Sequence, residues 1–239
     1  DIHVYKTKTF EPFALYNRLT GGKGKQVGIG LIDIQGSTNP IKKLSAFIRA
    51  NFFLPDARRG WVSFATKAAK NIHNSFNIDA IITTGPPHSS HLIGLKIQKK
   101  LSIPWIADMR DPWTTGFFNM ALPRTGIAKA IEKRYENKVI AHSNYVTVVS
   151  PGLRNEFKGQ NKNIALVYNG YDQEDIPEPT SYKSETFALS YIGNFKPNQN
   201  VPALWQAMEE LCNEVEGFMI HFRLSLTGTV DEQVNREME

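Results

Sequence analysis

Cysteine is nearly absent from this chain of 239 residues, because Cys212 is the only one. A single cysteine cannot form an intrachain disulfide, which favours a reducing compartment such as the cytoplasm. No apolar run approaches the roughly 18–20 residues that a transmembrane helix needs. The sequence also has no P-loop, no Gly-x-Ser-x-Gly elbow and no Cys-x-x-Cys pair, so the chemistries of those motifs have no support.

The composition that is present is ordinary for a globular protein, with 41% hydrophobic and 21% charged residues. This length suits one large domain or two modest ones. The formal net charge of +5 suits nucleic acid, a phosphorylated ligand or an anionic membrane surface, and it does not choose among them.

Short β-branched apolar runs alternate with helical patterns along most of the chain, which predicts βαβ units and a mostly parallel sheet. The expected strands are 27–34, 80–83, 103–107, 145–149, 164–168, 187–192 and 220–226. The expected helices are 41–53, 61–76, 88–101, 126–141 and 201–215. Most of these strands lack polar alternation, which predicts a sheet covered on both faces. The fold class is therefore α/β: a Rossmann-like parallel sheet with flanking helices, plus an incomplete second Rossmann-like domain.

A polar, proline-containing stretch without periodicity, residues 172–185, indicates a linker. It separates a first domain, 1–171, which lacks its first strand, from the start of a second domain, 186–239. Only about one and a half βα units follow the linker, whereas doubly wound domains usually need ~100 or more residues. We therefore expect a fragment, cut at both ends.

The loop after the second expected strand is a candidate ligand site, because ligands bind beyond the carboxyl ends of parallel strands. Gly85 permits a sharp turn, Ser89 can cap the following helix, and the helix N-terminus can seat an anion. His88 and His91 lie three residues apart and share a face. A metal pair and a capped helix with surface histidines are alternatives, although zinc needs three or four ligands and no set is evident.

The loop after the third expected strand carries Asp108, Arg110, Asp111, Trp113 and Thr114. The charges could form a structural ion pair, or one carboxylate could act as a general base or position a hydroxyl. The tryptophan could stack on a sugar or simply pack in the core.

Two glycine-containing segments give weaker signals. Residues 21–30 are glycine-rich, but a helical pattern precedes them and a strand pattern follows, which is the reverse of a dinucleotide-binding fingerprint. A loop is expected there. Asn169, Gly170 and Asp172 belong to a turn at the domain junction.

These segments together resemble the retaining glycosyltransferases of family four (group 1), and specifically the bacterial surface-polysaccharide subgroup. The resemblance rests on TTGPPHSSHLIG at 83–94, PWIADMRDPWT at 104–114, NGYD at 169–172 and LSYIG at 189–193, with PDARRGW at 55–61. It covers nearly the whole chain, and its long motifs are the specific ones.

The resemblance implies the GT-B fold of two Rossmann-like domains, with acceptor binding in the first and nucleotide-sugar binding in the second. It implies transfer of a sugar with retention to a glycan or lipid-linked acceptor, by a metal-independent enzyme of the hexosyltransferase type that has no cofactor. Asp111 and His88 are the catalytic candidates. The residues expected to bind substrate are Gly85, Ser89, His91, Asp108, Arg110, Trp113 and Thr114. Those expected near the donor are Asn169, Gly170, Asp172, Gly193, Asn194 and Lys196, where Lys196 would replace the basic residue that usually stands at position 194. The fragment alone should be inactive.

Residues 41–59 combine apolar and basic side chains and could lie on an anionic inner-membrane surface, or could simply be a core-facing helix with a solvated basic side. We expect a cytoplasmic protein, with a peripheral position on the membrane as one possibility and no nucleic-acid partner. The rival functions are an NDP-sugar epimerase of the same architecture and a basic nucleic-acid-binding module. The second would interleave basic and aromatic residues on one face, whereas here the basic residues are scattered.

Overall fold

A computed structural model describes residues 2–10, 40–176 and 186–238. The chain divides into two compact units, Asp1–Tyr171 and Asp172–Glu239, and each is described by itself. The expected strand at 27–34, the glycine-rich loop at 21–30 and most of the expected linker lie outside the described residues. In the part of the chain that is described, no helix is both long and apolar enough to cross a membrane.

The first unit contains a four-stranded sheet in which every neighbouring pair is parallel and the order is β1-β2-β3-β4. The strands are β1 (Ile81–Gly85), β2 (Trp105–Met109), β3 (Tyr145–Val148) and β4 (Ile164–Leu166). The helices of this unit are α3 (Pro40–Phe52), η1 (Ala57–Trp61), α4 (Val62–Phe76), α5 (Ser89–Leu101), α6 (Phe117–Met120), α7 (Gly126–His142) and α8 (Pro151–Phe157). The predicted Rossmann-like α/β fold is therefore confirmed.

Local chemistry explains several helix ends. The Thr125 side chain accepts a hydrogen bond from the Ala128 N–H at the start of α7, as an N-cap residue does. Helices α4 and α5 end at Asn77 and Ser102, which adopt left-handed φ angles of 49° and 55°. Ser150 caps α8, which begins with Pro151.

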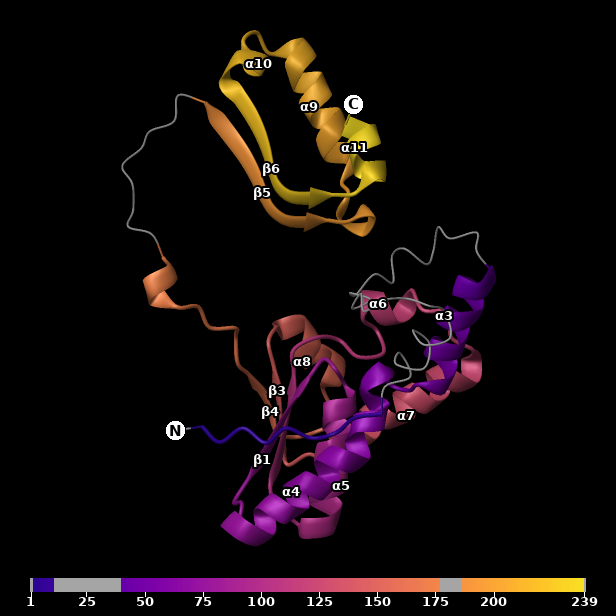
Figure 1. The fold of residues 1–239 in the computed structure, drawn as a ribbon. Coiled ribbons are helices and arrows are strands. Elements are labelled where there is room, and N and C mark those ends of the chain that lie inside the picture. Colours follow the sequence, from indigo (N-terminus) through magenta and orange to yellow (C-terminus); the bar gives the residue numbers. More distant parts are fainter. Residues whose placement is uncertain (1, 11–39, 177–185, 239) are drawn as a thin grey trace. The chain divides into compact units, whose positions relative to one another are not determined.

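The core lies on one side of the sheet, where α4, α5 and α7 pack (Figure 1). Trp105, Ala107 and Met109 of β2 point into it and are fully buried. On the other side, Ile82 is 70% exposed and Tyr145 is 54% exposed. The expectation of strands covered on both faces is therefore wrong for the described residues, because their helices pack on one face.

The second unit begins with η2 (Gln173–Asp175) and contains two long parallel strands, β5 (Phe187–Phe195) and β6 (Phe222–Val230). The intervening elements are η3 (Pro197–Gln199), α9 (Pro202–Glu214) and α10 (Phe218–His221), and α11 (Glu232–Met238) follows β6. The Phe195 ring packs edge-on against Trp205 of α9, which joins the helix to the sheet. A strand–helix–strand order with parallel strands agrees with the expected start of a second Rossmann-like domain.

Candidate functional site

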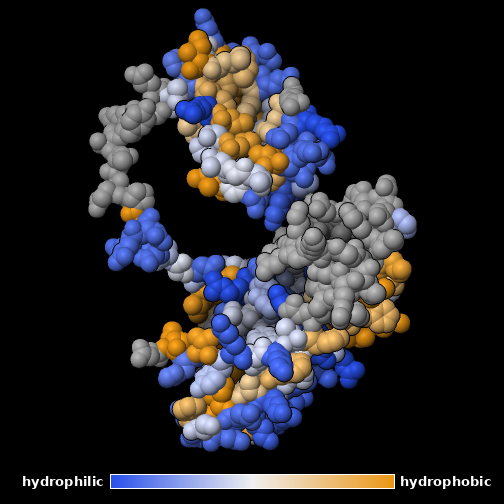
Figure 2. Space-filling model, in the orientation of Figure 1, coloured by the Kyte–Doolittle hydropathy of each residue, from blue (hydrophilic) through white to orange (hydrophobic). Residues whose placement is uncertain are grey.

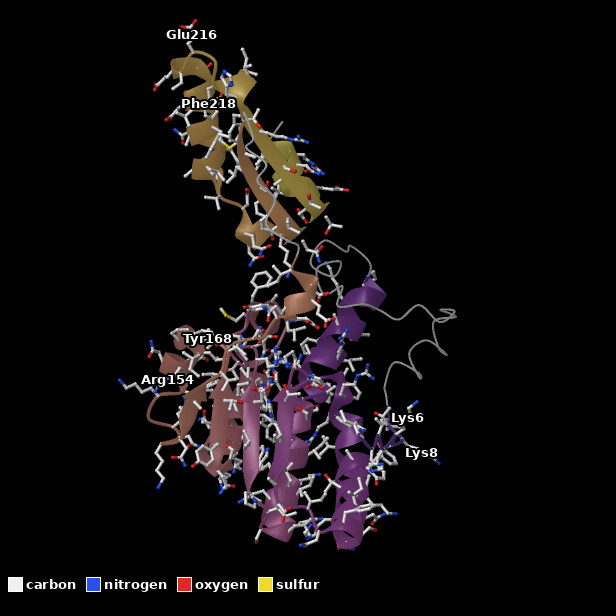
Figure 3. All side chains as sticks on the ribbon, turned by 90° about the vertical axis from the view of Figure 1, so that its left-hand side faces the viewer. Lys6, Lys8, Arg154, Tyr168, Glu216 and Phe218 are labelled. Atoms are coloured by element: carbon white, nitrogen blue, oxygen red, sulfur yellow. The ribbon has the colours of Figure 1, made fainter. Side chains whose placement is uncertain are left out.

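The two loops that carry the main motifs lie side by side at the carboxyl edge of the first sheet. Strands β1 and β2 are parallel, and Gly85 pairs with Met109 where they end. The N–H of Arg110 continues this ladder by donating to the Gly85 carbonyl over 3.1 Å. Tyr168, which follows β4, lies at the same end of the strands (Figure 3). The neighbourhood expected from the sequence is therefore present.

Asp108 occupies the centre of this edge, on the face of β2 opposite the core. Thr84 of β1 donates its hydroxyl hydrogen to Asp108 Oδ2 over 2.8 Å. Thr147 of β3 donates to Asp108 Oδ1 over 2.6 Å. A carboxylate has about four acceptor positions, so two hydroxyls fix its orientation and leave room for a further donor. The side chain is 22% exposed and can be reached from solvent.

Arg110 connects this carboxylate to the segment after β4. Its Nη1 lies 4.0 Å from Asp108 Oδ2, and its Nη2 donates to Asn169 Oδ1. Arg110 is half exposed, so the pair adds little stability. The contact instead brings two of the sequence motifs together, the one after β2 and the one at the junction.

His88 and Trp113 form an aromatic stack on the core side of the same edge. Their rings are nearly parallel, at 5°, with centroids 4.6 Å apart. His91, one turn further along α5, lies 6.0 Å from the His88 ring and is fully buried. Trp113 is also buried, so it packs in the core of this unit and is not an exposed stacking platform.

A hydrogen-bond chain runs beneath this stack. Trp105 Nε1 donates to Thr83 Oγ1 over 2.8 Å, and Thr83 Oγ1 lies 2.9 Å from His91 Nδ1. His88 Nδ1 and His91 Nε2 are buried and have no hydrogen-bond partner among the described residues. Both face Gly85, where a Cβ would lie 2.5 Å from His91 Nε2 and 3.1 Å from His88 Nδ1. A glycine at this position is therefore required by the packing of the two imidazoles.

Both imidazoles are neutral near pH 7. Burial, and secondarily the charge of Arg124, lowers the pKa of His88 to about 4. Burial, and secondarily His88 itself, lowers the pKa of His91 to about 3. Desolvation disfavours the charged form of a histidine, so neither ring carries a proton to donate as an imidazolium.

The N-terminus of α5, expected to seat an anion, holds a carboxylate of the chain itself. Asp56 Oδ2 accepts from the Ser89 N–H, and Asp56 Oδ1 accepts from the Ser89 hydroxyl, both over 2.8 Å. Asp56 Oδ1 also accepts from the Arg58 N–H. Ser89 is fully buried. The geometry gives Ser89 a structural partner, and its role as a substrate ligand stays a prediction. Asp56 had no assigned role from the sequence, because 33 residues separate it from its partner; the only signal was its place in the PDARRGW motif.

A buried ion pair in α7 and the residues before it contacts the segment that carries Asp56. Arg124 and Glu132 are almost fully buried and are in direct contact. Arg124 also donates to Asn119 Oδ1, to the Ala50 carbonyl and to the Pro55 carbonyl. Burial lowers the pKa of Arg124 to about 10, although nearby Asp56 raises it, so the guanidinium stays charged at neutral pH. The pair ties α7 to the segment that carries Asp56.

Thr114 also has a structural partner. Its N–H and hydroxyl donate to the two oxygens of the buried Glu136, over 3.1 and 2.9 Å. Lys133 donates to the same carboxylate. The carboxylate therefore fixes the end of the loop after β2, and substrate binding by Thr114 stays a prediction.

Asp111 is exposed in the loop between Arg110 and Trp113. Within the described residues its carboxylate has no hydrogen-bond or ion-pair partner, so it is open to a ligand. No group of three or more metal-ligating side chains occurs in the described ranges. The two neighbouring histidines are not joined by a third such side chain there.

In the second unit, the expected donor residues lie at and just beyond the carboxyl end of β5. Gly193 has a φ of 143° and pairs with Gly228 of β6, which has a φ of 125°. A Cβ at Gly228 would overlap the Gly193 carbonyl, so the strands need glycine there. Asn194 Oδ1 accepts from Thr229, and the Lys196 N–H donates to Gln199. The sequence analysis did not include Gly228 among the expected donor residues. The signal that could have identified it is that Gly228, like Gly193, follows an apolar run.

Asp172 caps η2 by accepting a hydrogen bond from the Glu174 N–H over 3.0 Å. Gly170 is exposed, with nothing within 4 Å of a Cβ built on it. Asn169 of the junction motif is joined to the site of the first unit through Arg110.

Comparison with known families agrees with this geometry. No curated protein matches the sequence. The model of the family described as Glycosyltransferase Family 4 matches residues 34–175, which is more than half of the chain and includes all four strands of the first sheet. The chain therefore belongs to glycosyltransferase family 4.

Proposed function

We propose that this family 4 protein moves a sugar from a nucleotide-sugar donor to a glycan or lipid-linked acceptor in bacterial cell-surface polysaccharide synthesis, with retention of configuration. The observation that carries the proposal is the Asp108 carboxylate, held by Thr84 and Thr147 and open to solvent at the carboxyl edge. Such an oriented carboxylate can accept a hydrogen bond from a sugar hydroxyl and fix its position for attack.

In this proposal the first unit binds the acceptor. Asp108 and Arg110 orient its hydroxyls, and the exposed carboxylate of Asp111 contacts the reacting hydroxyl. His88 is neutral, because burial lowers its pKa to about 4, so it acts as a hydrogen-bonding group and not as a cation. Gly85, His91 and Trp113 shape the wall behind it.

The second unit binds the donor in this proposal. The backbone at Gly193 carries no side chain, so a diphosphate can approach it closely. Asn194 and Lys196 follow on the same strand end, and Asn169, Gly170 and Asp172 belong to the junction. Departure of the nucleoside diphosphate needs charge stabilisation, which backbone N–H groups and Lys196 would supply without a metal ion. The donor phosphate would help to remove the proton from the acceptor hydroxyl.

The experiment is to screen the full-length gene product against nucleotide-sugars for a rise in melting temperature, because a ligand of the native state stabilises it. Donors that bind are then incubated with and without polysaccharide or lipid-linked acceptors, and release of nucleoside diphosphate is measured. The proposal expects acceptor-dependent release and a product of unchanged anomeric configuration. Conversion of the free nucleotide-sugar without an acceptor would instead indicate an epimerase, and the absence of any stabilising nucleotide-sugar would overturn the proposal.

A position on the cytoplasmic face of the inner membrane, through residues 41–59, is also part of the proposal. A lipid-linked acceptor would be met there, and the segment carries exposed apolar side chains beside basic ones.

A further inference from the structure

Helix α3 and the start of α7 form one continuous surface. Asn51, near the end of α3, donates from Nδ2 to the Pro123 carbonyl over 2.9 Å. Its Oδ1 accepts from the N–H of Thr125, the N-cap residue of α7, over 2.7 Å. The helices are also in direct contact. The side chains that they turn outward therefore belong to the same surface.

This surface is unusually apolar for exposed helices. Ala46 and Ala50 are the small residues that α3 buries, while its large side chains point outward. Leu44 is 60% exposed, and Ile127 of α7 is 76% exposed. In Figure 2 orange side chains gather over α3 and α7. We call this the α3–α7 face; its apolar members are Leu44, Phe47, Ile48, Phe52, Ile127 and Ile131.

The exposed charge on these two helices is of one sign. Helix α3 contains no acidic residue, and its exposed Lys43 precedes Leu44 directly. Helix α7 has two acidic residues, Glu132 and Glu136, and both are buried. Arg134 and Lys138 follow Ile127 and Ile131 at helical spacing, so these four residues share one side of α7.

We infer that the α3–α7 face docks on an anionic lipid bilayer. Large apolar side chains flanked by lysine and arginine insert into the boundary between headgroups and acyl chains, and the cations meet the lipid phosphates. Two copies of the chain that paired through this face would bring cations against cations, and α3 and α7 have no exposed acidic residue to compensate. The inference assigns the contact to α3 and α7 together, whereas the sequence indicated residues 41–59 alone.

The role of this membrane contact, which is to bring the site to a lipid-linked acceptor, rests on the proposed function. Its test uses no sugar nucleotide, so failure of lipid binding and failure of sugar transfer are separate outcomes. The 239-residue chain is incubated with vesicles of phosphatidylglycerol and phosphatidylcholine in equal amounts, and in parallel with phosphatidylcholine alone. Co-sedimentation is measured at low and high salt. Binding to the anionic vesicles, weakened by salt, is expected, with little binding to the neutral ones.

Two double variants locate the contact. Leu44→Glu with Ile127→Glu removes the two anchors, and we expect vesicle affinity to fall at least about tenfold. Lys43→Glu with Arg134→Glu reverses two charges, and a loss of at least about 25-fold is expected, because each basic residue contributes about fivefold. The matched controls are Phe76→Glu with Ile220→Glu and Lys67→Glu with Lys70→Glu, which lie on exposed positions of other elements and should retain wild-type affinity.

Circular dichroism establishes that each variant is folded before its affinity is compared. Equal losses in the test and control variants, or no binding of the wild-type chain to anionic vesicles, would overturn the inference. A third outcome would also overturn it: the wild-type chain does not bind vesicles, and sedimentation velocity shows a dimer that the Leu44→Glu, Ile127→Glu variant no longer forms. The α3–α7 face would then join two copies of the chain.

Discussion

The carboxylate of Asp56 accepts hydrogen bonds from both the N–H and the hydroxyl of Ser89, which lies 33 residues further along the chain. One side chain thus closes the N-terminus of α5 and joins the motif at 55–61 to the motif at 83–94. A carboxylate at a helix N-terminus also interacts favourably with the helix dipole. The loop that carries His88 is held in place by this contact.

Asp56→Ala should lower the free energy of unfolding by about 2–4 kcal/mol. The change removes a helix cap, worth about 0.5–2 kcal/mol, and leaves the buried hydroxyl and N–H of Ser89 unsatisfied, which costs about 1–3 kcal/mol. Urea denaturation measures the difference. Asp111→Ala, at an exposed carboxylate without a partner in the described residues, is the control and should stay within about 0.5 kcal/mol of wild type. Equal values for the two variants would show that the contact contributes no stability.

Acidification should destabilise the first unit through the partly buried His88 and the fully buried His91. Their pKa values in the folded chain are about 4 for His88 and about 3 for His91, below the ordinary value of about 6.5. The unfolded chain therefore binds protons at a higher pH than the folded chain. Their stabilising contribution is complete above pH ~6.5 and is lost as the pH falls towards 4 and 3, by up to about 1.4 kcal/mol per pH unit for each ring.

His88→Phe tests this because it keeps the stack on Trp113 and removes one titrating group. The slope of unfolding free energy between pH 6 and 4.5, which lies inside the window above, should be shallower in this variant. Carboxylates also titrate at acid pH, so the comparison is the difference from wild type. Phe76→Leu, at an exposed aromatic residue that does not titrate, should leave the slope unchanged. A slope identical in all three proteins would contradict the prediction.

Removing one partner of the buried Arg124–Glu132 pair should lower the free energy of unfolding more than replacing both partners. Arg124→Met alone or Glu132→Leu alone leaves an uncompensated buried charge and should lower stability by about 3–5 kcal/mol. The double variant should lose less than the sum of the two, because neither charge is then stranded. A double-mutant cycle in urea gives the coupling. Arg236→Met, which breaks an exposed pair with Glu232, should cost at most about 1 kcal/mol.

Asp111→Asn in the full-length enzyme should reduce turnover strongly, about 100-fold or more for a group of this kind, and leave the melting temperature unchanged. Asp108→Asn should reduce both turnover and stability, because its amide cannot accept from both threonine hydroxyls through equivalent oxygens. Asp79→Asn, at the opposite end of the sheet, is the control and should behave as wild type. Wild-type turnover of Asp111→Asn would remove this residue from the catalytic machinery.

Within the described residues, the sequence predicted the strands and the longer helices well, because apolar runs and helical periodicity are local signals. β1 at Ile81–Gly85 and α5 at Ser89–Leu101 fall within a few residues of their expected bounds. Short elements such as α6 and α8 were missed, since four to seven residues give too little periodicity. The bare face of the sheet was also missed, because apolar strand runs do not reveal which helices cover them.

The sequence predicted that the two loops of the candidate site lie side by side, but not the contacts that their residues make. Parallel strands guarantee that the ends of β1 and β2 meet, so the two loops could be placed together. Nothing local identifies Asp56 as the partner of Ser89, or Glu136 as the partner of Thr114. Such contacts between distant segments depend on the packing of whole helices, and the sequence supplied only the residue types.

The hydrogen bonds from Trp105 through Thr83 to His91 bear on which ring nitrogen of neutral His91 carries the hydrogen. The Thr83 oxygen receives the indole hydrogen, so its own hydrogen is directed to His91 Nδ1, its other partner in the described structure. This arrangement favours the neutral tautomer that carries its hydrogen on Nε2, which faces Gly85. This tautomer would place the Nε2 hydrogen of His91 in the space that Gly85 leaves by having no side chain.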